Sequence, residues 1–184
     1  MKRIKNLFML AVVAFSTTTV IAQKTKMVGG AAMYPTKNII ENAVNSKDHT
    51  MLVAAVKAAG LVETLSGAGP FTVFAPTNAA FAKLPKGTVD NLLKPESKDA
   101  LTGVLTYHVI AGKISAADVV AAIKKGGGKF VAKTVAGGDL TFSLKGKKVQ
   151  ITDANGGKSY VTIADVNQSN GVIHVVDGVL LPKM

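Results

Sequence analysis

The amino-acid sequence predicts an α+β domain in which helices pack on a twisted antiparallel sheet. In the first half of the chain, apolar residues recur at the spacing of a helix face. From Lys129 onward they alternate with polar residues, as in strands that bury one face. Gly residues and Asn-Gly pairs separate these alternating runs, as is typical of hairpin turns. A chain whose helices come in the first half and whose strands come in the second half is typical of an α+β fold.

Residues 1–22 predict a secretory signal peptide. Basic residues precede an apolar run from Leu7 to Phe15, and small residues follow up to Ala22. The run is far shorter than the roughly 20 residues of a membrane-spanning helix, and Ser16 to Thr19 interrupt it. We therefore expect cleavage after Ala22, with an uncleaved anchor as the alternative. The mature chain then has no transmembrane segment and is secreted, periplasmic or held at the cell surface.

The rest of the chain predicts one domain with a short leading arm. Residues 23–37 contain Gly29-Gly30 and Pro35 with little periodicity, which favours a linker or a loosely docked arm. Residues 38–184 are long enough to bury a core without covalent staples. The chain has no cysteine, so we expect stability from packing and not from disulfides.

The chain is strongly basic, and nearly all of its positive charge is lysine. The formal net charge is +11, and the only arginine, Arg3, lies in the predicted signal peptide. The mature chain therefore has no guanidinium group, the side-chain group that most often forms paired hydrogen bonds to bases and phosphates. For this reason we expect no specific binding of nucleic acid. The charge favours weak contact with anionic polymers or lipid head groups, and solubility is the alternative interpretation.

Helix start and stop signals divide the first half into short helices. Asn38 can cap the first helix, and Gly60 follows the second. Ser115 and Asp118 have the spacing of a capping box at the start of the last helix. The expected helices have their apolar stripes at Ile39–Val44, Leu52–Ala59, Leu61–Leu65, Ala79–Leu84, Val89–Leu93, Leu101–Leu105 and from Val119 to the basic end at Lys125.

A buried strand turns directly into a helix near the middle of the chain. Phe74 belongs to the strand, and Pro76 lacks the amide needed to continue a ladder. Thr77 can then cap a helix whose apolar stripe includes Phe81. We expect five residues of this segment to act as a structural joint between the strand and the helix: Phe74, Pro76, Thr77, Asn78 and Phe81.

The remaining strands are expected from period-two alternation. Residues 107–110 predict a strand with Tyr107 and Val109 on one face and His108 and Ile110 on the other. Later strands are marked by Leu140, Phe142 and Leu144, by Val149 and Ile151, by Val161 and Ile163, and by Ile173 and Val175. The expected hairpin turns are Gly146, Asn155-Gly156, Asn170-Gly171 and Asp177-Gly178.

Three segments together resemble the signature segments of fasciclin-like (FAS1, or beta-Ig-H3) domains. They are Phe71–Pro85, Tyr107–Lys113 and Asn170–Pro182, in the order that the family shows. The resemblance covers residues 38–182 and implies the FAS1 fold, a wedge or sandwich of sheet covered by helices. It also implies a non-catalytic adhesion or surface-interaction module whose partner is a cell-surface or matrix protein or a glycan.

The resemblance implies a contact site at Tyr107-His108. In the family this pair, set between branched apolar residues, is implicated in integrin-dependent adhesion, and here Leu105, Val109 and Ile110 flank it. A tyrosine offers a large rigid contact surface with one polar tip. The alternative for His108 is a buried histidine that is hydrogen-bonded to the turn at Pro76–Asn78.

No other motif indicates catalysis or a cofactor. His174 lies in a core strand and is expected to be a buried structural histidine, and His49 an exposed or capping one. The three histidines are dispersed and cysteine is absent, so no metal and no cofactor are expected. No serine occupies a Gly-x-Ser-x-Gly elbow, and no enzyme is indicated.

Two further functions remain open from the sequence. The fold could hold a small apolar molecule in a cleft between helices and sheet, and an apolar pocket near Tyr107 would favour this. Alternatively, lysines could attach the domain to anionic envelope or matrix polymers. The lysines proposed for this role are Lys124, Lys125, Lys129, Lys133, Lys145, Lys147 and Lys148.

Overall fold

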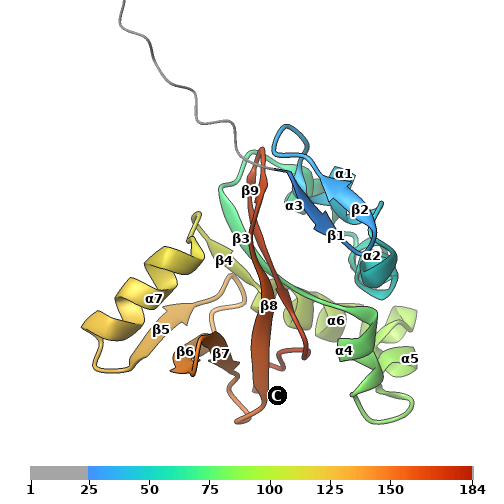
Figure 1. Ribbon diagram of the computed structural model, residues 1–184. Coiled ribbons are helices and arrows are strands. Elements are labelled where there is room, and N and C mark those ends of the chain that lie inside the picture. The colour runs from blue at the N-terminus through green and yellow to red at the C-terminus, as the bar shows by residue number, and fades with distance from the viewer. Residues whose placement is uncertain (1–24, 184) are drawn as a thin grey trace, which may run out of the picture.

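The computed structural model describes residues 25–183 (Figure 1), so the predicted signal peptide lies outside the described residues. The helices are α1 (Ile39–Ala43), α2 (Thr50–Ala59), α3 (Val62–Ser66), α4 (Asn78–Ala82), α5 (Thr88–Leu92), α6 (Lys98–Tyr107) and α7 (Ala116–Lys125), with 3₁₀ turns at Lys47–His49 and Pro95–Ser97. The strands are β1 (Lys26–Val28), β2 (Ala31–Met33), β3 (Phe71–Pro76), β4 (Val109–Ala111), β5 (Lys129–Lys133), β6 (Asp139–Lys145), β7 (Lys148–Thr152), β8 (Lys158–Gln168) and β9 (Gly171–Val176).

Seven strands form one sheet in the order β4-β3-β9-β8-β7-β6-β5. Neighbouring strands are antiparallel except β3 and β9, which pair in parallel from Phe71↔Gly171 to Pro76↔Val176. The α+β class is therefore confirmed, with this parallel pair as an unpredicted feature. Asp177-Gly178 is not a hairpin turn, because no strand follows β9 in the described part of the chain.

The sheet opens into a wedge between β7 and β8. Only three residue pairs join these strands, from Gln150↔Tyr160 to Thr152↔Lys158. Beyond Tyr160, β8 continues against β9 with two register irregularities, while β7 stays with β6. Figure 1 shows α7 beside β5 on one side of the wedge and the other helices on the far side of β3 and β9.

Each side of the wedge has its own apolar core. The first joins α1, α2, α3 and α6 to one face of β3 and β9, through residues such as Leu52, Val56 and Val175. The second packs Val119 and Ile123 of α7 against the strands β5, β6 and β7. Alternation along β3 sends Val73 and Ala75 into the first core and Phe74 into the second, so this strand holds both cores together.

The predicted joint after β3 is confirmed. Thr77 has extended backbone angles and its hydroxyl accepts a hydrogen bond from Ala80 N at 3.2 Å, which caps α4. Pro76 ends β3, and Phe81 is buried in the first core. Asn78 fastens the joint to the start of α2, because its side chain donates to Lys47 O and Thr50 Oγ1 and accepts from Met51 N.

We expect Thr77→Ala to lower the free energy of unfolding by about 1 kcal/mol, because the substitution removes the cap of α4. The midpoint of urea denaturation measures this loss. Thr88→Ala is a matched control, since Thr88 is the first residue of α5 and its cap position is Gly87. Equal midpoints for Thr77→Ala and the unchanged protein would contradict a stabilising role for this cap.

The expectation of a linker at residues 23–37 is wrong for its described part. Residues 26–33 form a hairpin of β1 and β2 around Gly29-Gly30, both with positive φ. Val28 and Met33 are each 3% exposed and belong to the first core. The prediction failed because only two side chains of this short hairpin are buried, which gives no readable period.

Candidate functional site

Tyr107 is the last residue of α6 and is fully buried, with 0% of its surface exposed. Its hydroxyl donates a hydrogen bond to Asp139 O at 2.7 Å and accepts one from Ala154 N at 3.0 Å. A side chain at Gly138 would meet the tyrosine ring, since its Cβ would lie 2.7 Å from Cε2. Burial raises the pKa of the phenol. The tyrosine therefore fastens α6 to the open end of the β6–β7 hairpin, at the first residue of β6 and at the turn after β7.

The predicted contact site is an interior site. His108 is 2% exposed, and Leu105, Val109 and Ile110 are each 5% exposed, so none of them presents a surface to a partner. The predicted strand over residues 107–110 is also wrong at its start, because Tyr107 ends a helix and His108 is its C-cap. This sharp turn directs Tyr107 and Ile110 into the second core, and Leu105 and Val109 into the first.

His108 is a buried structural histidine, but its predicted partner is wrong. Its Nδ1 lies 2.8 Å from Val104 O, and its Nε2 accepts a hydrogen bond from Leu180 N at 2.9 Å. These partners require the neutral ring with the proton on Nδ1. Burial lowers the pKa of His108 to about 4. The ring thus joins α6 to the chain after β9, and not to the turn at Pro76–Asn78.

His174 is the buried histidine that the sequence predicts. Its Nε2 lies 2.9 Å from Ile114 O, its Nδ1 accepts from Asp165 N at 3.2 Å, and its ring stacks on Phe74 with centroids 5.6 Å apart. Burial lowers its pKa. His49 occupies the N-cap position of α2, one of its two predicted roles, but its side chain makes no capping hydrogen bond and it is buried, at 3% exposed, and not exposed. Its Nδ1 lies 2.8 Å from Ser46 Oγ, and burial lowers its pKa as well.

Asn170 is a structural residue that sequence reasoning assigned only to a turn. Its Oδ1 accepts from Ile39 N, and its Nδ2 donates to Leu65 O and Gly67 O at 2.8 Å each. One side chain thus satisfies the backbone at the start of α1 and at the end of α3. Its place in an Asn-Gly turn was the only signal in the sequence, and that signal does not indicate long-range bonds.

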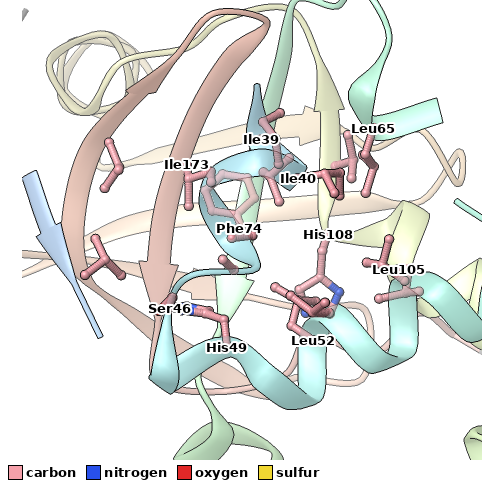
Figure 2. A pocket seen from close by; sticks show the side chains of 18 of the residues that line it. Ile39, Ile40, Ser46, His49, Leu52, Leu65, Phe74, Leu105, His108 and Ile173 are labelled. Carbon is pink, nitrogen blue, oxygen red and sulfur yellow. Dashed lines mark hydrogen bonds between the residues drawn. The ribbon is translucent and has the colours of Figure 1, made fainter. Parts of the chain in front are cut away.

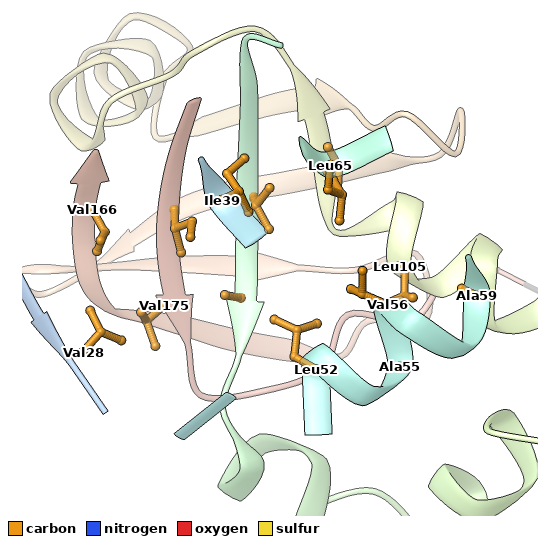
Figure 3. Packing of buried hydrophobic residues seen from close by; sticks show 14 of the residues in the cluster. Val28, Ile39, Leu52, Ala55, Val56, Ala59, Leu65, Leu105, Val166 and Val175 are labelled. Carbon is orange, nitrogen blue, oxygen red and sulfur yellow. The ribbon is translucent and has the colours of Figure 1, made fainter. Parts of the chain in front are cut away.

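An apolar cavity lies beneath α1 and α2, and Figure 2 shows side chains that line it. Its volume is about 50 Å³, far below the roughly 300 Å³ at which ligand pockets begin. Ser46, His49 and His108 reach it, but Tyr107 does not line it. Leu52, Val56 and Leu105 are also among its lining residues, and Figure 3 shows them with other buried side chains of the first core. This closed core does not favour the predicted apolar-ligand site near Tyr107.

The exposed candidate site is a set of lysines on one face of the sheet. Cross-strand pairing places them on the outer face of β5–β8, because paired residues of antiparallel strands project to the same side. All are exposed, and Asp139 is the one carboxylate among their strand neighbours on this face. We call this set the lysine face, and it comprises Lys129, Lys133, Lys145, Lys148 and Lys158.

The lysine face has a shallow polar depression. Lys129, Lys145 and Lys158 surround it, and Thr141 and Ser143 are among the side chains between them. Within residues 25–183 the one salt bridge joins Lys83 to Asp177 on another part of the surface, at 3.8 Å. The ammonium groups of the lysine face are therefore free to meet an anionic partner.

The predicted lysines divide between three places. Lys129, Lys133, Lys145 and Lys148 belong to the lysine face, which Lys158 completes. Lys124 and Lys125 end α7, and Lys147 lies in the turn between β6 and β7. Sequence reasoning missed Lys158 because cross-strand register, and not spacing along the chain, brings it beside Thr152.

Across the described range, 25–183, no three His, Asp or Glu side chains gather closely enough to hold a metal ion. No helix in this same part of the chain combines the length and apolar character needed to cross a bilayer.

Comparisons with known proteins agree with this architecture. A fasciclin domain model matches residues 47–182. Protein sll1483 of Synechocystis sp. is 50% identical over 162 residues, which are 88% of this chain and 83% of that protein. The cell surface glycolipoprotein MPB83 of Mycobacterium bovis is 39% identical over 122 residues, which are 66% of this chain and 48% of that protein.

A solved structure supports the fold. The FAS1 domain pair of the insect cell adhesion molecule fasciclin I superposes with a TM-score of 0.70, at 19% identity, over 79% of this chain and 51% of that one. At this identity the likeness concerns the fold alone. Together with the family model, which spans well over half of the sequence, it confirms the resemblance drawn from three segments: the chain belongs to the fasciclin domain family.

Proposed function

We propose that this domain is an exported, non-catalytic adhesion module that attaches to acidic polysaccharide of a cell surface or matrix through the lysine face. The observation that carries the proposal is the gathering of five exposed lysines on one sheet face with a single carboxylate among them. Hydroxyl groups between the lysines can bond to sugar hydroxyls, while the ammonium groups attract carboxylate or sulfate groups. The printed names of MPB83 and fasciclin I describe a cell-surface and an adhesion protein, which supports this class of function.

The predicted alternative through Tyr107 and His108 is not part of this proposal. A tyrosine with no exposed surface must leave its pocket before it can touch a partner, and it would abandon two hydrogen bonds in doing so. The lysine face needs no such rearrangement.

We expect the triple variant Lys129→Gln, Lys145→Gln, Lys158→Gln to bind a sulfated or carboxylated polysaccharide about tenfold more weakly than the unchanged protein. Three exposed ion pairs of about 0.5 kcal/mol each give a factor of this size. Binding of the unchanged protein should fall steeply between 50 mM and 500 mM salt, because salt screens exposed charges. Biolayer interferometry on an immobilised polysaccharide measures both effects.

The matched control is Lys86→Gln, Lys94→Gln, Lys98→Gln, which removes the same charge from exposed positions on the helical side. This variant should bind within about twofold of the unchanged protein. If both triple variants lose affinity equally, only the net charge matters and the lysine face is not a site. Salt-insensitive binding would rule out the electrostatic attachment altogether.

A further inference from the structure

A second surface feature lies where β7 and β8 separate. β8 has its last partner on β7 at Tyr160, and beyond it Val161, Thr162 and Ala164 line the gap. On the other side of the gap, β7 begins at Lys148, which pairs only with β6. The first turns of α7 line the gap with Ala116, Val119 and Val120, and so turn it into a cleft.

The cleft is apolar inside and of useful size. Its volume is about 290 Å³, close to the lower end of the range for ligand pockets. Phe74, Phe142 and His174 reach its interior, and these three side chains are buried. The cleft shares only Phe74 with the 50 Å³ cavity beneath α1 and α2, so the two are separate sites.

The polar groups of the interior are already satisfied by the protein. Both ring nitrogens of His174 have backbone partners, and its lowered pKa keeps the ring neutral. Asp165, on the neighbouring part of β8, accepts a hydrogen bond from Ala116 N at 2.7 Å and does not line the cleft. The interior therefore favours a hydrocarbon chain and demands no polar group from it.

The rim of the cleft, in contrast to its apolar interior, is positively charged. Lys147 and Lys148 line the cleft, both are exposed, and no Asp or Glu is among the lining residues. The one salt bridge within residues 25–183, between Lys83 and Asp177, does not involve them. Two ammonium groups beside an apolar interior are complementary to a molecule with an anionic head and an apolar tail.

We propose that this cleft binds a free medium-chain fatty acid, with its tail between α7 and β8 and its carboxylate at Lys147 and Lys148. The volume, at the lower end of the range for ligand pockets, suits one chain of medium length better than a long one. A single enclosed chain fits the cleft, whereas a membrane lipid brings two longer chains. This site goes beyond the proposed adhesion function and does not depend on it, and Lys148 is the one residue that belongs to both the cleft and the lysine face.

Isothermal titration of the mature protein with decanoate, below its micelle concentration, tests the proposal. Saturable binding is expected, about fourfold weaker for each methylene removed in the series decanoate, nonanoate, octanoate. Decanol should bind about tenfold more weakly than decanoate, because it lacks the charge. Absence of saturable binding, or equal affinity across the series, would overturn the proposal.

Substitutions locate the site. Val120→Phe narrows the cleft and should abolish binding, while Val135→Phe, at an exposed residue outside the cleft, should leave it unchanged. Lys147→Gln, in an exposed turn where folding is not at risk, should weaken decanoate about fivefold and leave decanol unaffected. If Val120→Phe unfolds the domain, the Lys147→Gln result decides. The site is contradicted if Lys147→Gln weakens the binding of decanoate and decanol equally, or if it weakens the binding of neither.

Two further measurements separate this site from its neighbours. The triple variant of Lys129, Lys145 and Lys158 should bind decanoate normally, since none of these residues lines the cleft. Vesicles of phosphatidylglycerol should not compete with decanoate. Competition by vesicles would mean that the cleft meets a membrane surface and would overturn the proposal of a free fatty acid.

Discussion

Tyr107→Ala should lower the free energy of unfolding by about 4 kcal/mol. Removal of a buried aromatic ring costs about 3–5 kcal/mol through lost contacts and the cavity left behind. The loss here includes two further contributions, because Asp139 O and Ala154 N each lose a hydrogen-bond partner in the interior. Urea denaturation followed by circular dichroism measures the change.

Tyr107→Phe separates the ring from its hydroxyl. This variant keeps the packing against Gly138 but loses both hydrogen bonds, and we expect it to remain folded and lose about 2 kcal/mol. A native-like stability for Tyr107→Ala, together with lost adhesion, would contradict the buried position and restore the tyrosine as a contact residue. Loss of both stability and adhesion in parallel would mark the residue as structural.

The domain should lose up to about 3 kcal/mol of stability through His108 alone when the pH falls from 7 to 4. The folded pKa of about 4 lies below the ordinary value of 6.5, so between these values the unfolded chain binds more protons than the folded one. Stability is therefore fully present above pH 6.5 and declines as the pH falls. His49 and His174 act in the same direction, because burial lowers the pKa of both.

The control for this prediction is His108→Gln, which cannot titrate. Its stability at pH 7 should be lower, since the amide cannot reproduce both bonds of the ring, but its stability should fall less between pH 7 and 4. Chemical denaturation at half-unit pH intervals gives both curves. Parallel curves for the two proteins would show that His108 does not cause the acid sensitivity.

Local chemistry made much of the fold predictable. The switch from strand to helix at Pro76 and Thr77 depends on a missing amide and a neighbouring hydroxyl, and both are visible in the sequence. The caps at Asn38 and Ser115 are equally local, and the structure has both as full capping boxes. Periodicity then located β6, because its buried and more exposed residues alternate, whereas β9 is buried on both faces.

Features that depend on distant parts of the chain were not predictable in this way. The parallel pairing of β3 with β9 joins segments about 100 residues apart, and nothing in either strand specifies its neighbour. The burial of Tyr107 depends on the start of β6 at Asp139 and on the turn at Ala154, which meet the tyrosine only in the folded domain. The same holds for the lysine face, whose members come from four strands.

The central position of β9 in the sheet constrains the order in which the domain can fold. This strand lies between β3 and β8, yet residues 171–176 are the last strand to be synthesised. A nascent chain therefore cannot assemble the middle of its sheet while it is still growing, and contacts so distant in sequence form slowly. The sheet therefore lacks its central strand, and β3 and β8 lack a shared partner, until residues 171–176 have been made.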